Sequence, residues 1–336
     1  MANARRLPRV ATILTGGTID SVGTDRLDLA WYVEANQRLA PGELLSRVPE
    51  LRQLADIQDV PFRRLPSHAL LDSDWLELAR TLQGLFDRDE ADGAVVTHGT
   101  NTLEETAYFL HLVLKTDRPI VVVGSMRPAS GLSADGDLNL VNAVRAAADP
   151  ASVGRGVLVV LNDTIHSARD VTKTATFRLE TFQARDLGPL GYADADGRVI
   201  YYHRPERQHT LSTDIDVRGL DRLPRVDVTV SSVGADATAI DAFVAAGARG
   251  LVSAGTGAGR PTPAEDVALD RAAANGVVVC QSTRTGSGRV VRSPQLTARG
   301  FVAADNLTPW KARVLLSLAL TRTSEPDEIQ RYFDTC

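Results

Sequence analysis

The sequence predicts an α/β fold made of two doubly wound domains, a larger N-terminal one and a smaller C-terminal one. Short apolar runs rich in β-branched residues alternate with longer runs whose apolar residues recur every three or four positions. This alternation stops between about residues 165 and 223 and then resumes. Because strands that alternate with helices favour an open sheet with right-handed crossovers, the interruption indicates two such sheets.

Four apolar runs in the first domain are predicted as buried strands of a parallel sheet. They cover residues 9–14, 93–99, 119–125 and 156–163. Amphipathic runs between them are predicted as helices. They cover residues 73–86, 101–114 and 138–148. At the start of the helix 101–114, Thr102 and Glu105 have the spacing of a capping box.

The interruption begins as a predicted hairpin, with the turn sequence ADGR, and continues as a polar connection that contains prolines. We therefore expect an N-terminal domain over residues 1–203, a linker over 204–222 and a C-terminal domain over 223–336. The C-terminal domain repeats the strand–helix alternation. Its predicted strands cover 226–233, 250–256 and 277–283, and its predicted helices cover 237–247 and 264–276.

Composition excludes several classes of function. The formal net charge is -5, which does not favour a nucleic-acid partner or an anionic membrane surface. No run approaches 18 apolar residues, so we expect no membrane span, and we interpret the N-terminal apolar run as a strand rather than a signal peptide. The two cysteines, Cys280 and Cys336, make a poor disulfide framework and suit a reducing cytoplasm. The six histidines lack the spacing of metal ligands, so we expect no metal.

Three segments place hydroxyl or amine groups where predicted strands end, which is where ligands bind in such sheets. They are TILTGGTID with Thr18, THGT with Thr100, and NDTIHSARDVTKTAT, a loop-like segment with Lys173. Each alone has an ordinary explanation: a glycine turn, a helix start or a solvated lysine. Together they indicate a hydrolytic site, in which one hydroxyl attacks and an amine relays a proton. Neither a phosphate-binding glycine loop nor a G-x-S-x-G turn is found in the sequence.

These residues resemble the signatures of the bacterial-type L-asparaginase family. TGGTI at 15–19 is similar to the first signature, and THGTNTLEETAYFL at 97–110 is similar to the second. Later blocks such as GPLGY and GFVAADNLTPWKARVLL follow in the family's order, so that the resemblance spans about residues 9 to 334. It implies an asparaginase-like fold and an amidohydrolase that needs no cofactor.

The resemblance also implies a role for individual residues. Thr18 corresponds to the nucleophile and Tyr32 to the mobile tyrosine that assists it, while Thr100 and Lys173 correspond to the second threonine and its lysine. Ser67 corresponds to the serine that binds the substrate carboxylate. The predicted substrate-binding set is Gly17, Ser67, His68, Gly99 and Asn101. The family further implies a small-molecule amide as substrate, with L-asparagine as the default, and a homotetramer built from intimate dimers.

Four positions depart from the family pattern. Asn101 replaces an aspartate that holds the α-ammonium of the substrate, and His68-Ala69 replace a glutamine-aspartate pair. Ala258 replaces an asparagine, and the segment RTGSGRVVRSP is basic where the family often has an acid. Each change removes a feature that would hold a cationic amino group.

The departures leave alternatives open. An amide or lactam without a free α-amino group is nearly as well supported as L-asparagine, with Arg289 or Arg292 available to help Ser67 hold a carboxylate. A catalytically silent ligand-binding homologue, or a nucleotide-binding domain, are the other classes; the retained Thr18, Thr100 and Lys173 count against them. Because Asn101 carries no charge, we also expect the pKa of Lys173 to fall.

Overall fold

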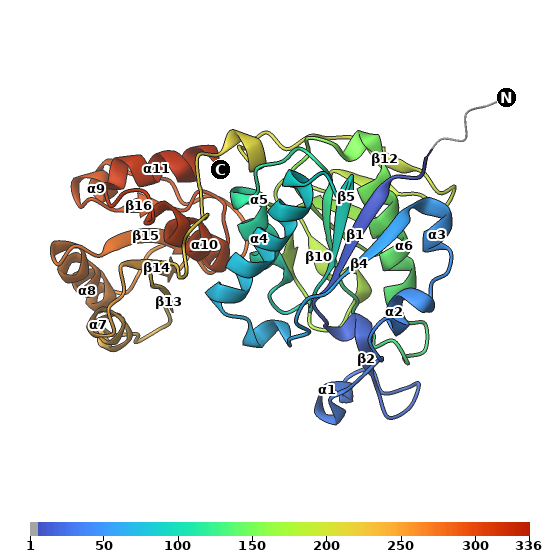
Figure 1. Cartoon of the computed structure of the whole chain (residues 1–336). Coiled ribbons are helices and arrows are strands. Elements are labelled where there is room, and N and C mark those ends of the chain that lie inside the picture. The colour runs from blue at the N-terminus through green and yellow to red at the C-terminus, as the bar shows by residue number, and fades with distance from the viewer. Residues whose placement is uncertain (1–5) are drawn as a thin grey trace. The chain divides into compact units, whose positions relative to one another are not determined.

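The chain folds into two compact units in the computed structural model, which describes residues 6–336 (Figure 1). The first unit ends at Ser212, and the second covers Thr213–Cys336. The boundary between the two units therefore falls between Ser212 and Thr213.

The first unit contains an eight-stranded sheet in the order β12-β11-β8-β7-β6-β5-β1-β4. Five neighbouring strands are parallel: β4 (Asp56–Val60), β1 (Arg9–Leu14), β5 (Gly93–Thr97), β6 (Ile120–Val123) and β7 (Val157–Leu161). Three are antiparallel to their neighbours: β8 (Thr164–Ser167), β11 (Gly191–Ala193) and β12 (Val199–Tyr201). The predicted hairpin is present as β11 and β12, but the sheet is mixed rather than wholly parallel.

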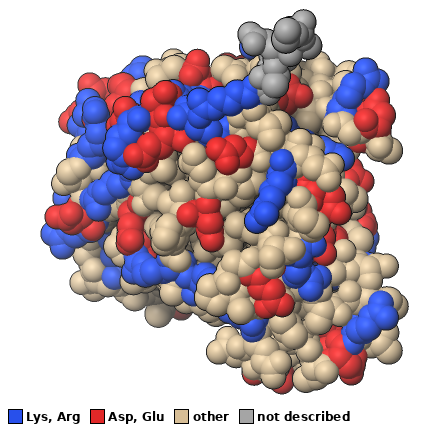
Figure 2. All heavy atoms as spheres, turned by 45° about the vertical axis from the view of Figure 1, so that its right-hand side comes forward, with Lys and Arg blue, Asp and Glu red and all other residues tan. Residues whose placement is uncertain are grey.

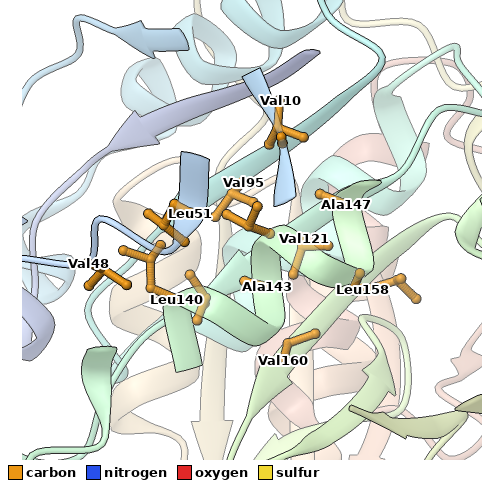
Figure 3. Close-up of a cluster of buried hydrophobic side chains, with 14 of the residues drawn as sticks. Val10, Val48, Leu51, Val95, Val121, Leu140, Ala143, Ala147, Leu158 and Val160 are labelled. Carbon is orange, nitrogen blue, oxygen red and sulfur yellow. The ribbon is translucent and has the colours of Figure 1, made fainter. Parts of the chain in front are cut away.

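Helices cover both faces of this sheet, as a doubly wound fold requires (Figure 1). On one side lie α4 (Asp72–Asp87) and α5 (Leu103–Val113); on the other lie α6 (Gly136–Ala148) and α3 (Leu51–Leu54). The core beneath α6 is built from alternate residues of the parallel strands, such as Val10, Val95 and Val121, packed against Leu140 and Ala143 (Figure 3). Alternate residues of a strand point to the same face, so these side chains of β1, β5 and β6 all lie on the face that α6 covers.

Several elements of the first unit differ from the predictions. The edge strand β4 was missed because its sequence, DIQDV, is not an apolar run. The segment predicted as a loop around Lys173, residues 162–176, contains strands β8 and β9 (Thr172–Lys173). The latter pairs antiparallel with β10 (Phe182–Gln183), which follows the segment. A second small pair, β2 (Ser21–Val22) and β3 (Gln37–Arg38), encloses α1 (Tyr32–Ala35), and α2 (Glu43–Ser46) follows it.

The capping box predicted for α5 is wrong. Thr102 is the N-cap residue, but its side chain makes no capping bond to the helix. Its hydroxyl instead donates to the Ser67 carbonyl oxygen at 2.8 Å. A capping box does occur in the second unit, where Thr262 and Glu265 form one at the start of α8. The start of α5 is therefore tied to a distant loop rather than to itself.

The second unit has a four-stranded parallel sheet in the order β13-β14-β15-β16. Its strands are β13 (Val226–Val230), β14 (Gly250–Gly255), β15 (Val278–Thr283) and β16 (Val302–Ala303). Its helices are α7 (Thr238–Ala245), α8 (Pro263–Ala274), α9 (Pro294–Ala298), α10 (Pro309–Ala319) and α11 (Pro326–Thr335). Cys280 on β15 and Cys336 are both buried and are not joined in a disulfide, and burial raises the pKa of the Cys280 thiol.

Candidate active site

Two loops meet where the adjacent parallel strands β1 and β5 end. The Thr15 hydroxyl donates to the Thr97 carbonyl oxygen at 2.7 Å and so continues the pairing beyond β1. Gly17 follows with a φ of 112°, and a Cβ placed on it would lie 2.6 Å from the Gly99 Cα. Glycine is required at position 17 because the two backbones touch and because the conformation is left-handed.

The turn after β1 presents Thr18 to a phenol. Thr18 begins a short 3-10 helix, Thr18–Asp20, and is only partly buried. Its Oγ1 lies 2.9 Å from the Tyr32 Oη, and either atom can be the donor. Tyr32 is the first residue of α1, and burial raises the pKa of its phenol. The pair can therefore pass a proton in either direction along one hydrogen bond.

The loop after β5 presents a second hydroxyl to an amine. Thr100 is buried, with 6% of its surface exposed, and its Oγ1 accepts from the Lys173 Nζ at 2.9 Å. The same amine lies 3.4 Å from the Asn101 Oδ1. His98, which precedes this loop, is buried, and burial lowers its pKa to about 4. His98 is therefore neutral near pH 7 and donates through Nδ1 to the Gly99 carbonyl oxygen at 2.8 Å.

Burial lowers the pKa of the Lys173 amine, and the charge of Glu104 raises it in opposition. The direction is the one expected from the sequence, but its first cause is the loss of water around the amine. No carboxylate occupies position 101 to oppose it. A lysine with a lowered pKa has a larger neutral fraction near pH 7 and is a better base.

Glu104 is a site residue that sequence reasoning missed. It is 5% exposed on α5, and its Oε1 accepts from the Thr172 hydroxyl and from the Lys173 backbone N–H, each at 3.0 Å. The carboxylate thus anchors β9, the strand that carries the lysine. An acid in the first turn of a helix is common for other reasons, so the pattern TLEE alone gave no reason to select it.

Ser67 lies in a third loop, within the 3-10 helix Ser67–Ala69. It is buried, and a Cβ placed on Gly99 would lie 2.6 Å from its Oγ. His68, which follows it, is exposed, as is Asn101. Glycine at position 99 therefore leaves room for the Ser67 hydroxyl.

All nine predicted site residues line one cavity of about 650 Å³ in the first unit. The cavity lining is Gly17, Thr18, Ser21, Ala30, Tyr32, Val33, Arg38, Pro66, Ser67, His68, Gly99, Thr100, Asn101, Met126, Lys173, Thr174, Ala175, Thr176 and Phe177. None of these residues is an aspartate or a glutamate. Arg38 is among them and was not selected from the sequence.

The two arginines suggested as carboxylate ligands do not belong to this lining. The Arg289 guanidinium pairs with Asp305, and Arg292 pairs with Asp327 at 2.7 Å and donates to the Phe301 carbonyl oxygen. All of these partners lie in the second unit. A role for Arg289 or Arg292 in holding a carboxylate therefore stays a prediction.

Family models match almost the whole chain. The Asparaginase, N-terminal model matches residues 9–207, and the Glutaminase/Asparaginase C-terminal domain model matches residues 225–333. The chain belongs to the bacterial L-asparaginase family. The resemblance found in the sequence and the predicted asparaginase-like α/β fold are thereby confirmed, and this member of the L-asparaginase family is a hydrolase of C–N bonds other than peptide bonds.

Individual relatives agree with the family models. The chain is 43% identical to a probable periplasmic L-asparaginase of Haemophilus influenzae, covering 99% of this chain and 95% of the relative. It is 42% identical to L-asparaginase 2 of Escherichia coli, covering 98% and 94%. The fold is also similar to the crystal structure of a probable cytoplasmic L-asparaginase from Campylobacter jejuni, with a TM-score of 0.89 and 39% identity. This match covers 98% of this chain and 100% of the other.

Among residues 6–336, no group of three or more histidines, cysteines and acids is arranged to hold a metal ion. No helix in the same range is long and apolar enough to cross a membrane. On the face shown in Figure 2, lysines and arginines are interspersed with aspartates and glutamates rather than gathered into one basic patch.

Proposed function

We propose that this asparaginase-family hydrolase cleaves a carboxamide through an acyl-enzyme on Thr18. The Thr18 Oγ forms a bond to the carbonyl carbon, and the C–N bond of the amide then breaks. The hydroxyl proton passes through Tyr32 to the departing nitrogen, which leaves as ammonia or an amine. Water then attacks the acyl carbon, and the carboxylic acid product and the threonine hydroxyl are restored.

The observation that carries this proposal is the pair of hydroxyls held by two different proton carriers. Thr18 is partly exposed to the cavity and bonded to a phenol at 2.9 Å, whereas Thr100 is 6% exposed and bonded to an amine at 2.9 Å. The more accessible hydroxyl suits attack on a bound amide. The Thr100–Lys173 pair suits removal of a proton from water or from the attacking group, since its amine has a lowered pKa.

L-asparagine is the reference substrate because relatives of this chain are named L-asparaginases. A second candidate is an amide without a free α-amino group, and the absence of aspartate and glutamate from the cavity lining favours it. Removing the charge partner of a substrate ammonium at a desolvated site typically costs about 2–5 kcal/mol of binding free energy. Ser67 would hold the carboxylate of either substrate.

Ammonia release from succinamate and from L-asparagine tests the function and the substrate together. Succinamate is asparagine without its amino group, so the ratio of the two kcat/KM values isolates that group. A Thr18→Ala variant should abolish turnover of both. Turnover by that variant would contradict the role of Thr18 as nucleophile. If the native chain turns over neither substrate, the ligand-binding alternative is favoured.

We further propose a homotetramer that works in the cytoplasm on a small-molecule amide, without a cofactor. The tetramer follows from the family alone. Two buried cysteines that form no disulfide, and the relative described as cytoplasmic, support the compartment, although the Haemophilus relative is described as periplasmic.

A further inference from the structure

Arg38 brings a cation to the cavity at a place where the family signatures gave no reason to expect one. It lies on β3, and the β2–β3 pairing places it opposite Ser21, three residues after Thr18. The next backbone N–H, that of Leu39, donates to the Asp20 carbonyl oxygen at 2.8 Å. The small antiparallel pair therefore fixes Arg38 beside the turn that carries the proposed nucleophile.

The guanidinium of Arg38 lies over the glycine turn. A Cβ placed on Gly16 would lie 2.5 Å from the Arg38 Nη1 and 3.5 Å from the Leu65 carbonyl oxygen. Leu65 in turn donates its N–H to the Thr15 carbonyl oxygen at 2.9 Å. The cation thus lies where the Thr18 turn and the segment leading to Ser67 run side by side.

The acid nearest to Arg38 is already neutralised by another arginine. Arg64 donates to the Asp20 Oδ2 through Nε at 2.9 Å and through Nη2 at 2.6 Å. The Arg38 Nη1 forms a longer ion pair with the other oxygen of Asp20, at 3.9 Å, which is too far for a hydrogen bond. Among the residues that the structure describes, this Nη1 finds no hydrogen-bond partner. Two guanidinium groups thus share the single Asp20 carboxylate, and Arg38 has the weaker contact with it.

We infer that Arg38 is the specificity residue that provides the counter-charge for a substrate carboxylate, together with the Ser67 hydroxyl. The cavity lining holds Arg38, Lys173 and His68 but no aspartate or glutamate. Such a site fits the monoamide of a dicarboxylic acid, whose net charge is negative, better than a zwitterionic amino acid. This inference rests on the proposed amidase function and names the substrate class of the same site.

Binding of succinate, the product expected from succinamate, tests the inference without any turnover. Calorimetric titration compares the native chain with Arg38→Gln and Arg38→Met, the latter of which keeps much of the apolar stem. Losing a hydrogen-bonded counter-charge should weaken succinate binding roughly ten- to one-hundred-fold. Arg47→Gln is the matched control, because Arg47 pairs with Asp137 at 3.3 Å and does not line the cavity.

A kinetic comparison separates charge recognition from general damage. Butyramide has a methyl group in place of the carboxylate of succinamate, so Arg38→Gln should lower the kcat/KM ratio of succinamate to butyramide by a similar factor. Succinate affinity unchanged in both Arg38 variants, with native-like thermal unfolding, would overturn the inference and leave Arg38 as a partner of Asp20 only. No succinate binding by the native chain would overturn it as well.

The two proposals fail in different ways. If Thr18→Ala keeps its turnover, the nucleophile is wrong, but the titration with succinate still reports on Arg38. If Thr18→Ala is inactive while the Arg38 variants bind succinate normally, the amidase function stands and the carboxylate site is wrong.

Discussion

At the scale of single residues, Asn101 lies close enough to Lys173 for a substitution at position 101 to change the pKa of that amine. The Asn101 Oδ1 lies 3.4 Å from the Lys173 Nζ, and burial already lowers the pKa of that amine. An anion at position 101 would favour the ammonium form. The residue at position 101, which we propose to influence substrate preference, would therefore also affect the pKa of the lysine.

We expect Asn101→Asp to raise the pKa of Lys173 and to move the rising limb of the pH–kcat profile to higher pH. The sign follows because the neutral amine is the active form, and a neighbouring carboxylate delays its deprotonation. Ammonia release measured from pH 6 to 10 checks this shift. Asn275→Asp, an exposed change at the end of α8, is the control and should leave the profile in place. A profile that moves to lower pH in Asn101→Asp would contradict the role of Lys173 as base.

The residue scale also shows where sequence reasoning was sufficient. Thr18, Thr100 and Lys173 were selected because hydroxyls and an amine follow strand ends, and all three line one cavity. Arg38 and Glu104 could not be selected in the same way. An arginine in a polar stretch and an acid at a helix start each have a common explanation, and only the folded chain shows what they contact.

At the scale of elements, the strand β9 depends on a helix far away in sequence. Glu104 on α5 accepts from both the Thr172 hydroxyl and the Lys173 backbone N–H. The segment has no apolar run and is therefore predicted as a loop, whereas its short strand is held by this contact and by pairing with β10. Local pattern could not reveal it.

We expect Glu104→Ala to destabilise the chain by about 1–3 kcal/mol, because two buried donors lose their acceptor. Ammonia release should also fall by more than the loss of folded protein explains, because Lys173 is no longer held toward Thr100. Urea unfolding and ammonia release measure the two effects. Glu104→Gln keeps an acceptor and removes the charge, so it should restore much of the stability while lowering the pKa of Lys173 further. Equal loss of activity and stability in both variants would argue against an anchoring role.

The contact between the loops after β1 and β5 gives a second prediction at this scale. In Gly17→Ala, the new Cβ would collide with the Gly99 backbone at 2.6 Å, in addition to the strain of the left-handed conformation. Gly276 also has a positive φ, 81°, but a Cβ placed on it meets nothing within 4 Å, so Gly276→Ala is the control. We expect strain alone, roughly 1–2 kcal/mol, in the control. The site variant should lose more stability and nearly all ammonia release, and equal thermal unfolding of the two would show that the loops can separate.

At the scale of the whole molecule, alternation along the sequence was enough to predict two α/β units. β1 covers the predicted residues 9–14, and α4, α5 and α6 overlap their predicted ranges. The polar edge strand β4 and the antiparallel strand β8 were missed, because a strand at the edge or in a hairpin needs no continuous apolar run. The resemblance, rather than periodicity, identified the chemistry.

Assembly is the prediction that belongs to this scale. We expect four chains in one particle, and therefore a mass close to four times the 36.1 kDa of the chain. Light scattering during size-exclusion chromatography measures it, and dilution over a hundredfold range tests whether the particle persists. A stable monomer that releases ammonia at the full rate would contradict the tetramer and show that one chain carries a complete site.

The exposure of His68 and Asn101 has a consequence for how this protein can diverge. The groups proposed for bond cleavage are held by close backbone contacts, as between Gly17 and Gly99, which tolerate little substitution. His68 and Asn101 lie on the same cavity but are exposed. Substitutions at these two positions can therefore change which amide is bound while the proposed reaction stays the same. A mutant library aimed at new amide substrates is thus best begun at His68 and Asn101 rather than at the glycines.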